Sequence, residues 1–583
     1  TTANSNTAVG LQALSTDTKG DNSVAIGENA LLTQNFTTST DSYNTAVGSN
    51  AGRAVTTGLY NTLIGGLAGD ALTDADFNVA VGQNALTVDT LGSKSTAIGA
   101  AALNVQNFTT ATDALNTAVG YSSGASVTTG QSNTLIGALS GDALTTANSN
   151  VAVGGSALTS DTLGSRSVAV GQGTLGLQNF TTATNSYNVA VGYAAGDHIT
   201  TGTFNVLIGG LAGDALTNAD NNVAVGTSTL SNDTLGSKST AIGHSALANQ
   251  NFTTATDSHN TAVGNEAGNA VTTGVENTLI GGLAGDALTD ADYNVVVGTS
   301  ALSADTLGSR SIAIGYKALE AQNFTTATDA YNVAMGHFAG GSLTTGIVST
   351  FIGGLAGDAI TTANNNVAVG YRALTTETSG ANCTAIGTNT LAAQNVGSGT
   401  NVGNTAVGYD AGTAVTSGVQ NVFVGAYAGD GTQTGTQNVA VGQEALSAVA
   451  GNTNTAVGTF SLNVCTGSDN TAVGMLAGGS LTSGSNCLFV GHDAGRTGSP
   501  GGNHTTSNNA LVLGDENIAA AHIQVDWTVA SDQRDKTDFT ALDVGLDFVN
   551  ALKPVTYKWD KRSKYGDKTA DDYDLNNITT DGT

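Results

Sequence analysis

Asn44-Thr45-Ala46-Val47-Gly48, with the stretch that follows it as far as Gly58, is the unit of sequence that decides the fold of this chain. Close variants that begin with Asn or Ser recur at offsets of 17, 21, 17 and 17 residues, so the pattern opened by Asn6 returns at Asn78 after 72 residues. A fixed period of this size indicates a solenoid. Further copies open at Asn150, Asn222, Asn294 and Asn366, and a seventh that decays opens at Asn438.

Each unit contains two short runs rich in β-branched residues, and each run is closed by glycine, as Val47 is by Gly48 and Thr57 by Gly58. Glycine tolerates the positive φ of a sharp turn, and the chain has no helix-length apolar periodicity in this region. We therefore expect an all-β fold, a parallel β-solenoid or β-roll in which each unit forms one rung. Roughly 28 rungs at about 4.8 Å each would make a column on the order of 130 Å.

The strand of each rung has two apolar faces. Counting the opening Asn or Ser as position one, alternation places positions two and four, such as Thr45 and Val47, on one face, and position three, Ala46, on the other. Apolar residues on both faces predict burial on both sides. Because one coil has one interior, we expect the second face to meet another copy of the chain, in a homotrimer.

Position three is bulky in every fourth rung, where leucine or phenylalanine replaces alanine. Small residues would let copies approach closely, and a large one at intervals of about 19 Å would plug the axis between them. We therefore expect these residues at a subunit interface: Leu63, Leu135, Leu207, Leu279, Phe351 and Phe423. The aligned opening Asn residues predict a structural ladder of amides, and we assign them no catalytic role.

The 21-residue unit carries four extra residues that must leave the column as a loop. Phenylalanine recurs there in register, and Val396 breaks the series. Two interpretations stay open: each ring folds back over the base of its own loop, or the rings form an array of binding knobs on a rigid scaffold. The residues concerned are Phe36, Phe108, Phe180, Phe252 and Phe324.

Asp70, Asp74 and Asp76 look like a calcium loop, but their counterparts drift to Thr and Asn in later copies. A hard cation needs about six oxygen ligands in fixed geometry, so turn-forming residues are the better interpretation. The seven histidines show no metal-ligand spacing, and we expect neither a metal nor a cofactor.

Composition argues against several partners. The net charge of -28 argues against nucleic acid and anionic membranes, and no apolar run approaches the ~20 residues that span a bilayer. Three cysteines without paired spacing exclude a disulfide framework, and Cys383 and Cys487 stand where other rungs carry Asn or Ser, so we expect them to be packed small residues.

The composition changes near the C-terminus, where residues from Ser531 onward hold eight of the seventeen Lys and Arg. Thr540 to Asp543 reads as a capping box, and an apolar stripe of Leu542, Leu546, Val549 and Leu552 predicts a helix that stops before Pro554. We expect a small α+β segment here. The predicted divisions are a regular shaft over 1–437, irregular terminal repeats over 438–499, a transition over 500–525 and a separate domain over 526–583.

Three stretches carry a resemblance to a known family: Ser531-Asp532-Gln533-Arg534-Asp535-Lys536, then Gly545 to Val549, then Leu552 to Trp559. Together they resemble the opening of the endosialidase-type intramolecular chaperone, which in that family ends phage tail fibres and spikes, drives their trimerisation and then cuts itself off. The repeats resemble, more loosely, the left-handed β-roll of trimeric autotransporter heads, with Ser23 to Gly27 as the nearest stretch.

The resemblance implies a single-turnover serine peptidase activity. Ser531 would be the nucleophile and Lys536 the base, with the scissile bond at Ala530-Ser531 or beside it and Asp532 shaping the turn. A lysine acts as a base only when desolvation makes its amine partly neutral. Asp535 departs from the family's aliphatic residue, and the family's domain continues beyond the point where this chain stops, so only its N-terminal part is expected here.

The sequence therefore predicts a trimeric phage fibre, on the virion tail or otherwise extracellular, that binds a host cell-surface glycan or protein and joins an upstream virion protein. A bacterial cell-surface trimeric adhesin is the alternative. A solenoid depolymerase, which would need paired carboxylates in a groove, and an ice-binding protein, suggested by regular Thr-Thr pairs, are weaker alternatives.

Overall fold

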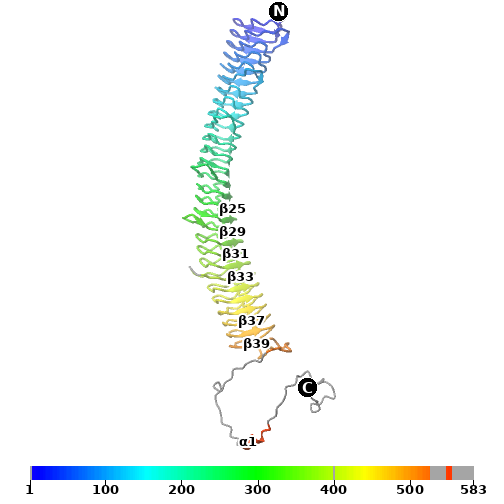
Figure 1. The fold of residues 1–583 in the computed structure, drawn as a ribbon, viewed down its shortest axis with the longest axis vertical. Coiled ribbons are helices and arrows are strands. Elements are labelled where there is room, and N and C mark those ends of the chain that lie inside the picture. Colours follow the sequence, from blue (N-terminus) through cyan, green and yellow to red (C-terminus); the bar gives the residue numbers. More distant parts are fainter. Residues whose placement is uncertain (1–2, 398–400, 525–545, 554–583) are drawn as a thin grey trace, which may run out of the picture. The chain divides into compact units, whose positions relative to one another are not determined.

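The computed structural model describes residues 3–397, 401–524 and 546–553, which fall into two units, Thr1–Ile518 and Ala519–Thr583. The first unit is one continuous stack of coils (Figure 1). In the second unit, α1 (Leu546–Ala551) is the described helix, which confirms the later part of the predicted helical stripe. Leu542 and the predicted capping box lie outside the described residues.

The main sheet is a parallel sheet of 29 strands, one for each rung, and this confirms the predicted all-β solenoid. Each strand has three residues, which occupy positions two to four of the rung. The strands are β1 Thr7–Val9, β3 Val24–Ile26, β5 Thr45–Val47, β6 Thr62–Ile64, β7 Val79–Val81, β9 Thr96–Ile98, β11 Thr117–Val119, β12 Thr134–Ile136, β13 Val151–Val153, β15 Val168–Val170, β17 Val189–Val191, β18 Val206–Ile208, β19 Val223–Val225, β21 Thr240–Ile242, β23 Thr261–Val263, β24 Thr278–Ile280, β25 Val295–Val297, β27 Ile312–Ile314, β29 Val333–Met335, β30 Thr350–Ile352, β31 Val367–Val369, β32 Thr384–Ile386, β33 Thr405–Val407, β34 Val422–Val424, β35 Val439–Val441, β36 Thr455–Val457, β37 Thr471–Val473, β38 Leu488–Val490 and β39 Leu511–Leu513.

Successive rungs stack in perfect register. Ala46 of β5 pairs with Leu63 of β6, which pairs in turn with Ala80 of β7, so each position of the repeat forms a column along the stack. The glycine that closes the strand, at position five, makes this close stacking feasible. Gly48 has a φ of 143°, and a Cβ there would lie 2.4 Å from the carbonyl oxygen of Gly65 in the next rung.

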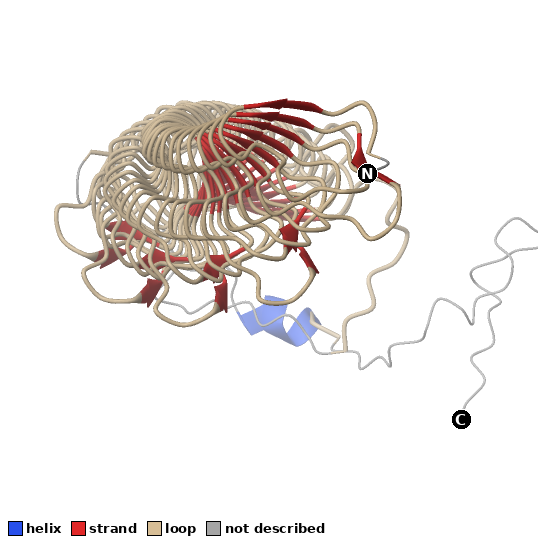
Figure 2. Cartoon of the chain, turned by 90° about the horizontal axis from the view of Figure 1, so that it is seen from above, coloured by secondary structure: helices blue, strands red, loops and turns tan. Residues whose placement is uncertain are grey.

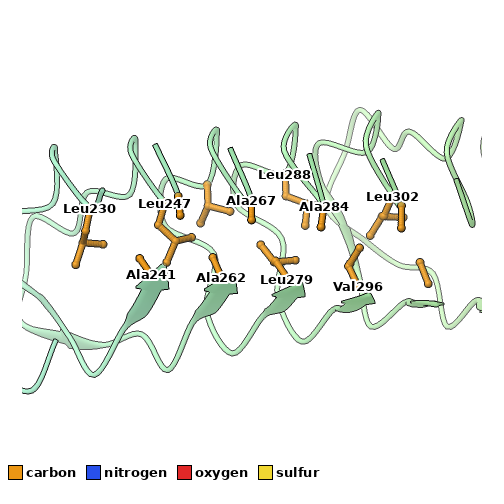
Figure 3. Close-up of a cluster of buried hydrophobic side chains, with 14 of the residues drawn as sticks. Leu230, Ala241, Leu247, Ala262, Ala267, Leu279, Ala284, Leu288, Val296 and Leu302 are labelled. Carbon is orange, nitrogen blue, oxygen red and sulfur yellow. The ribbon is translucent and has the colours of Figure 1, made fainter. Parts of the chain in front are cut away.

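The core lies inside the coil, and seen along the stack the main strands gather on one side of it (Figure 2). Position three points inward: Ala46 is fully buried, as are Ala51 and Val55 farther along the same rung. Figure 3 shows Ala262 and Leu279 pointing from the strands toward Leu247 and Leu288 on the opposite wall.

The bulky residues at position three lie inside their own coil, which corrects the prediction that they occupy a subunit interface. Leu63, Leu135, Leu207, Leu279, Phe351 and Phe423 are all 0% exposed in the single chain. The reason is volume: a Cβ at Gly52 or Gly69 would lie 2.6 or 2.8 Å from a methyl carbon of Leu63. Other rungs carry leucine at the position of these glycines, as at Leu86, and keep alanine at position three.

Positions two and four form the outward face of the main sheet, which no described part of the chain covers completely. Thr45 and Val47 are half-buried, and Ile64 is 38% exposed. The single chain therefore leaves the second apolar face partly open to solvent along the whole stack.

The 21-residue units add five small parallel sheets beside the main one. In each, two residues of the loop pair with two residues of the rung below, as Thr112–Asp113 does with Gly92–Ser93. The pairs are β2 Gly20–Asp21 with β4 Thr40–Asp41, β8 Gly92–Ser93 with β10 Thr112–Asp113, β14 Gly164–Ser165 with β16 Thr184–Asn185, β20 Gly236–Ser237 with β22 Thr256–Asp257, and β26 Gly308–Ser309 with β28 Thr328–Asp329.

Candidate functional site

The opening asparagines form the predicted structural ladder. Asn61 donates its backbone N–H to Asn44 Oδ1 at 2.9 Å and its Nδ2 to the carbonyl of Ala75 at 2.8 Å, while its own Oδ1 accepts the N–H of Asn78 at 3.0 Å. All three asparagines are fully buried. Each amide therefore links adjacent rungs and closes the turn of its own rung.

The loop phenylalanines are buried, so they are not binding knobs. Phe36, Phe108, Phe180, Phe252 and Phe324 are 4–6% exposed, and Val396, which replaces them in the sixth copy, is 8% exposed. A Cβ at Gly92 would lie 2.8 Å from the ring of Phe108. Of the two predicted interpretations, the one in which each ring covers the base of its own loop is confirmed.

A buried carboxyl group organises the same loop base. Asp89 Oδ1 accepts the N–H groups of Gly92 at 3.0 Å and Phe108 at 3.1 Å, and Gln106 Nε2 donates to Asp89 Oδ2 at 2.6 Å. Burial raises the pKa of Asp89, while the hydrogen bond from Gln106 and those from the backbone lower it in part. Sequence patterns missed this residue, although Asp17, Asp161, Asp233 and Asp305 repeat it every 72 residues.

The acidic residues that resemble a calcium loop bind the protein itself. Asp76 Oδ1 accepts the N–H of Leu59 at 2.7 Å, and Asn148, its counterpart in the second copy, accepts the N–H of Gln131 at 2.8 Å in the same way. The position needs only an oxygen acceptor, which explains why Asp and Asn interchange there. The turn-forming interpretation accounts for these contacts.

The Thr-Thr pairs also serve the stack. Thr56 Oγ1 donates to the carbonyl of Thr73 at 3.2 Å, and Thr57 Oγ1 donates to Asp74 Oδ1 at 2.5 Å, both in the next rung. Their hydroxyls bridge successive rungs, a role that ice binding would not require.

The three cysteines are buried and unpaired with one another. Cys383 takes the place of an opening Asn or Ser, and its N–H donates to Asn366 Oδ1 at 2.9 Å. Burial raises the thiol pKa of Cys383 and of Cys465 to about 11. Because the thiolate is the reactive form, the raised pKa makes Cys383 and Cys465 unreactive. All three cysteines are packed small residues, as predicted for Cys383 and Cys487.

Exposed aromatic rings form short stacks at the residue that precedes the opening Asn. The ring centroids of Tyr43 and Tyr60 are 5.7 Å apart, those of Tyr60 and Phe77 are 4.8 Å apart, and the three residues are 43–51% exposed. Arg310 lies over the rings of Tyr293 and Tyr331 in the same column. The constant offset from the opening Asn is the signal that would have found this column in the sequence.

One group of potential metal ligands occurs in the described part of the chain, near the end of the stack. Ligand atoms of His492, Asp493 and Asp515 lie within 4.8 Å of one another. Protein groups already engage both carboxylates: Arg496 donates to Asp493 at 2.7 Å, and Asn517 donates to both oxygens of Asp515. These contacts account for the cluster without an ion.

The residues predicted for self-cleavage, Ala530, Ser531, Asp532 and Lys536, lie outside the described residues. Their assignment therefore depends on sequence. Residues 531–574 match the family described as the chaperone of endosialidase. The match begins at Ser531 and includes the three stretches quoted from the sequence. It covers the C-terminal segment and leaves the repeats unmatched.

No curated protein matched the chain in a sequence comparison. Among the described residues, none of the helices has the length and apolar character that crossing a membrane requires. The chain thus combines a β-solenoid of about 28 turns with a chaperone of endosialidase segment.

Proposed function

We propose that this chain is the shaft of a homotrimeric virion fibre that serves host attachment, and that its C-terminal chaperone segment assists assembly of the trimer. The observation that carries the proposal is the order of the two parts: a long parallel stack followed by a chaperone of endosialidase match over 531–574. A stack of repeats is better suited to the role of a rigid spacer than to that of a catalyst.

The outward face of the main sheet supports association of copies. Val47 and Thr45 are half-buried, and isoleucines at position four, such as Ile64 and Ile136, are 38–39% exposed. Contiguous apolar surface of this extent is rare on monomeric proteins and marks interaction sites. We place this face at the contacts between the three chains, where burying it stabilises the trimer.

The assembly test measures the mass of the full chain in solution. Light scattering should give three times the chain mass of 57.6 kDa, or three times the mass of the cleaved shaft. Changing Ile64, Ile208 and Ile352 to lysine should dissociate the trimer. The matched control changes Tyr60, Leu115 and Val348 to lysine. These residues are more exposed than the three isoleucines and lie in the column where Lys94 and Lys238 occur. A wild-type monomer with intact β-structure would contradict the proposal.

We further propose self-cleavage at the Ala530-Ser531 bond. Lys536 would take the proton of the Ser531 hydroxyl, whose oxygen would bond to the carbonyl carbon of Ala530 as the C–N bond breaks and the amine is protonated. One water would then hydrolyse the ester, leaving a carboxylate on Ala530 and the hydroxyl on Ser531. In denaturing gels, the chain should run as two fragments, and its Ser531→Ala variant as one. Full-length migration of both would end this part of the proposal.

A further inference from the structure

One outward position of the coil keeps a small residue in every fourth rung, although no contact within the single chain requires it. This is position six, directly after the strand-closing glycine. In the fourth rung of each copy it is glycine or alanine, whereas most other rungs carry larger residues there, five of them tyrosine, with Ala100 and Gly155 as exceptions. The six small residues are Gly66, Ala138, Gly210, Gly282, Gly354 and Ala426.

Neither the backbone nor the surrounding side chains require glycine at this position. Gly66 and Gly210 do not have a left-handed φ, and a Cβ on either would have no atom of the described chain within 4 Å. At Gly282 the nearest atom would be the carbonyl oxygen of Asn265 at 4.0 Å. A glycine that no local constraint demands only increases the freedom of the unfolded chain, so its repetition points to a demand from outside the chain.

The next residue, position seven, repeats an apolar side chain in a costly conformation. Leu67, Leu139 and Leu211 are 37–38% exposed, with φ of 58–60°, a left-handed region that leucine rarely adopts. Many other rungs use Asn or Ser at this position, as at Asn50 and Asn84. We name the four residues from position four to position seven of each fourth rung the apolar step: residues 64–67, 136–139, 208–211, 280–283, 352–355 and 424–427.

We propose that the apolar steps are the contacts that fix the axial register between copies of this chain. The outward strand face is too uniform to do so, because a slip of one rung replaces Thr or Val by Val or Thr and leaves the face almost unchanged. Beside the strands of the outward face, the step is the feature that recurs in the fourth rung of each copy. A slip of one rung would set Leu67 against a level where the partner carries Gln83 and Asn84.

The occupant of the steps is a second copy because the partner must carry the same spacing. Six steps recur every 72 residues, at intervals of about 19 Å along the stack. A parallel copy at the same height presents its own small residue at each of these levels, and its own leucine at five of them and Tyr427 at the sixth. The inference rests on the proposed trimer and adds the feature that aligns its chains.

The test adds bulk where the single chain has room for it. A triple variant, Gly66→Tyr, Gly210→Tyr and Gly282→Tyr, is compared with Gln83→Tyr, Thr227→Tyr and Thr299→Tyr, which place the same side chain in the same column one rung later. Sedimentation equilibrium of the full chain should show at least about tenfold weaker association for the step variant and wild-type association for the control. Circular dichroism should show equal β-structure in both.

Association of the step variant as tight as that of the control would overturn the inference and leave the trimer standing. Equal loss in both variants would also overturn it, because the effect would belong to the whole column. A wild-type monomer would instead contradict the proposed function itself. Should the step variant lose β-structure, Leu67→Asn, Leu211→Asn and Leu283→Asn replaces it, since asparagine tolerates the left-handed conformation, and the same outcomes apply.

Discussion

At the scale of the residue, the large side chain of the interior comes from the strand in some rungs and from the turn in others. Leu63 occupies space that Gly52 and Gly69 leave open, while other rungs put leucine on the turn, as at Leu86, and alanine on the strand. A narrow coil admits one large side chain per level at either place. The 72-residue period is therefore a packing period as well as a sequence period.

Removing one of these large side chains should open a cavity. Leu207→Ala is expected to lower the free energy of local unfolding by about 2–5 kcal/mol, because Leu207 is 0% exposed and its neighbours are fixed by the stack. Hydrogen exchange in β17 to β19 measures the change. Ile208→Ala, which trims the outward face, is the control and should leave this exchange nearly unchanged while weakening association. Similar exchange in both variants would contradict the interior placement.

The buried carboxyls offer a second test at this scale. Asp161 accepts hydrogen bonds from Gly164, Phe180 and Gln178, so in Asp161→Asn an amide hydrogen must face one of three donors. We expect a cost of about 1–3 kcal/mol, seen as faster amide exchange at Phe180. Asp220→Asn is the control, since its counterpart is already Asn148 and one oxygen accepts both bonds from Thr203. An equal effect of the two changes would argue against the network.

At the scale of the element, each rung is held to the next by a strand and by an asparagine. The strand supplies the parallel pairing, and the asparagine closes the turn that follows. This division explains why strands of three residues suffice, although strands in globular proteins usually have about five or six.

Loss of a single ladder amide should remove a hydrogen bond within its own rung and another to the next rung. Asn133→Ala leaves the N–H of Asn150 and the carbonyl of Ala147 without their partner in a buried place, at about 1–3 kcal/mol for each group. Denaturant unfolding followed by circular dichroism should show a clear loss of stability. Asn133→Ser should lose less, because Ser349 already occupies this column. Indistinguishable midpoints for alanine and serine would count against the ladder.

The sequence was informative about elements and less so about their orientation. Regular spacing and glycine closure predicted the rungs and their register, and composition located the C-terminal segment. Alternation in Thr45 to Val47 defines two faces but does not say which one the coil encloses, so Leu63 was placed on the wrong side. Alanine at position three was the available clue, because a narrow interior has room for little else. The loop carboxyl of Asp89 was missed because its partners lie on other rungs.

At the scale of the whole molecule, the shaft is acidic and some of its acids are buried. Burial raises the pKa of Asp214, Asp286 and Asp430 above the value of 3.8 that serves for an unfolded chain, and one carboxyl oxygen of each is buried without a hydrogen-bond partner among the described residues. The folded chain therefore holds these protons more tightly than the unfolded chain does. Their stabilising contribution is complete below the unfolded pKa and is lost as the pH rises through the raised values.

The solenoid should accordingly become more stable as the pH falls from neutral to 3.8, the ordinary value of these carboxyl groups. Protonation also reduces repulsion within a chain of net charge -28, which acts in the same direction. Melting followed by circular dichroism at constant ionic strength measures the effect. Asp515, whose pKa is lowered by the side chain and backbone of Asn517, opposes the trend. A melting temperature that falls over this range would refute the expectation.

The stacking of rungs also determines how the shaft responds to force. Seventeen residues of extended chain span about 56–61 Å, whereas the rung that they form raises the stack by about 4.8 Å. Each rung that opens under tension on the two ends therefore yields a length of extended chain roughly ten times the height of the folded rung. Under tension we therefore expect the solenoid to lengthen by the opening of individual rungs.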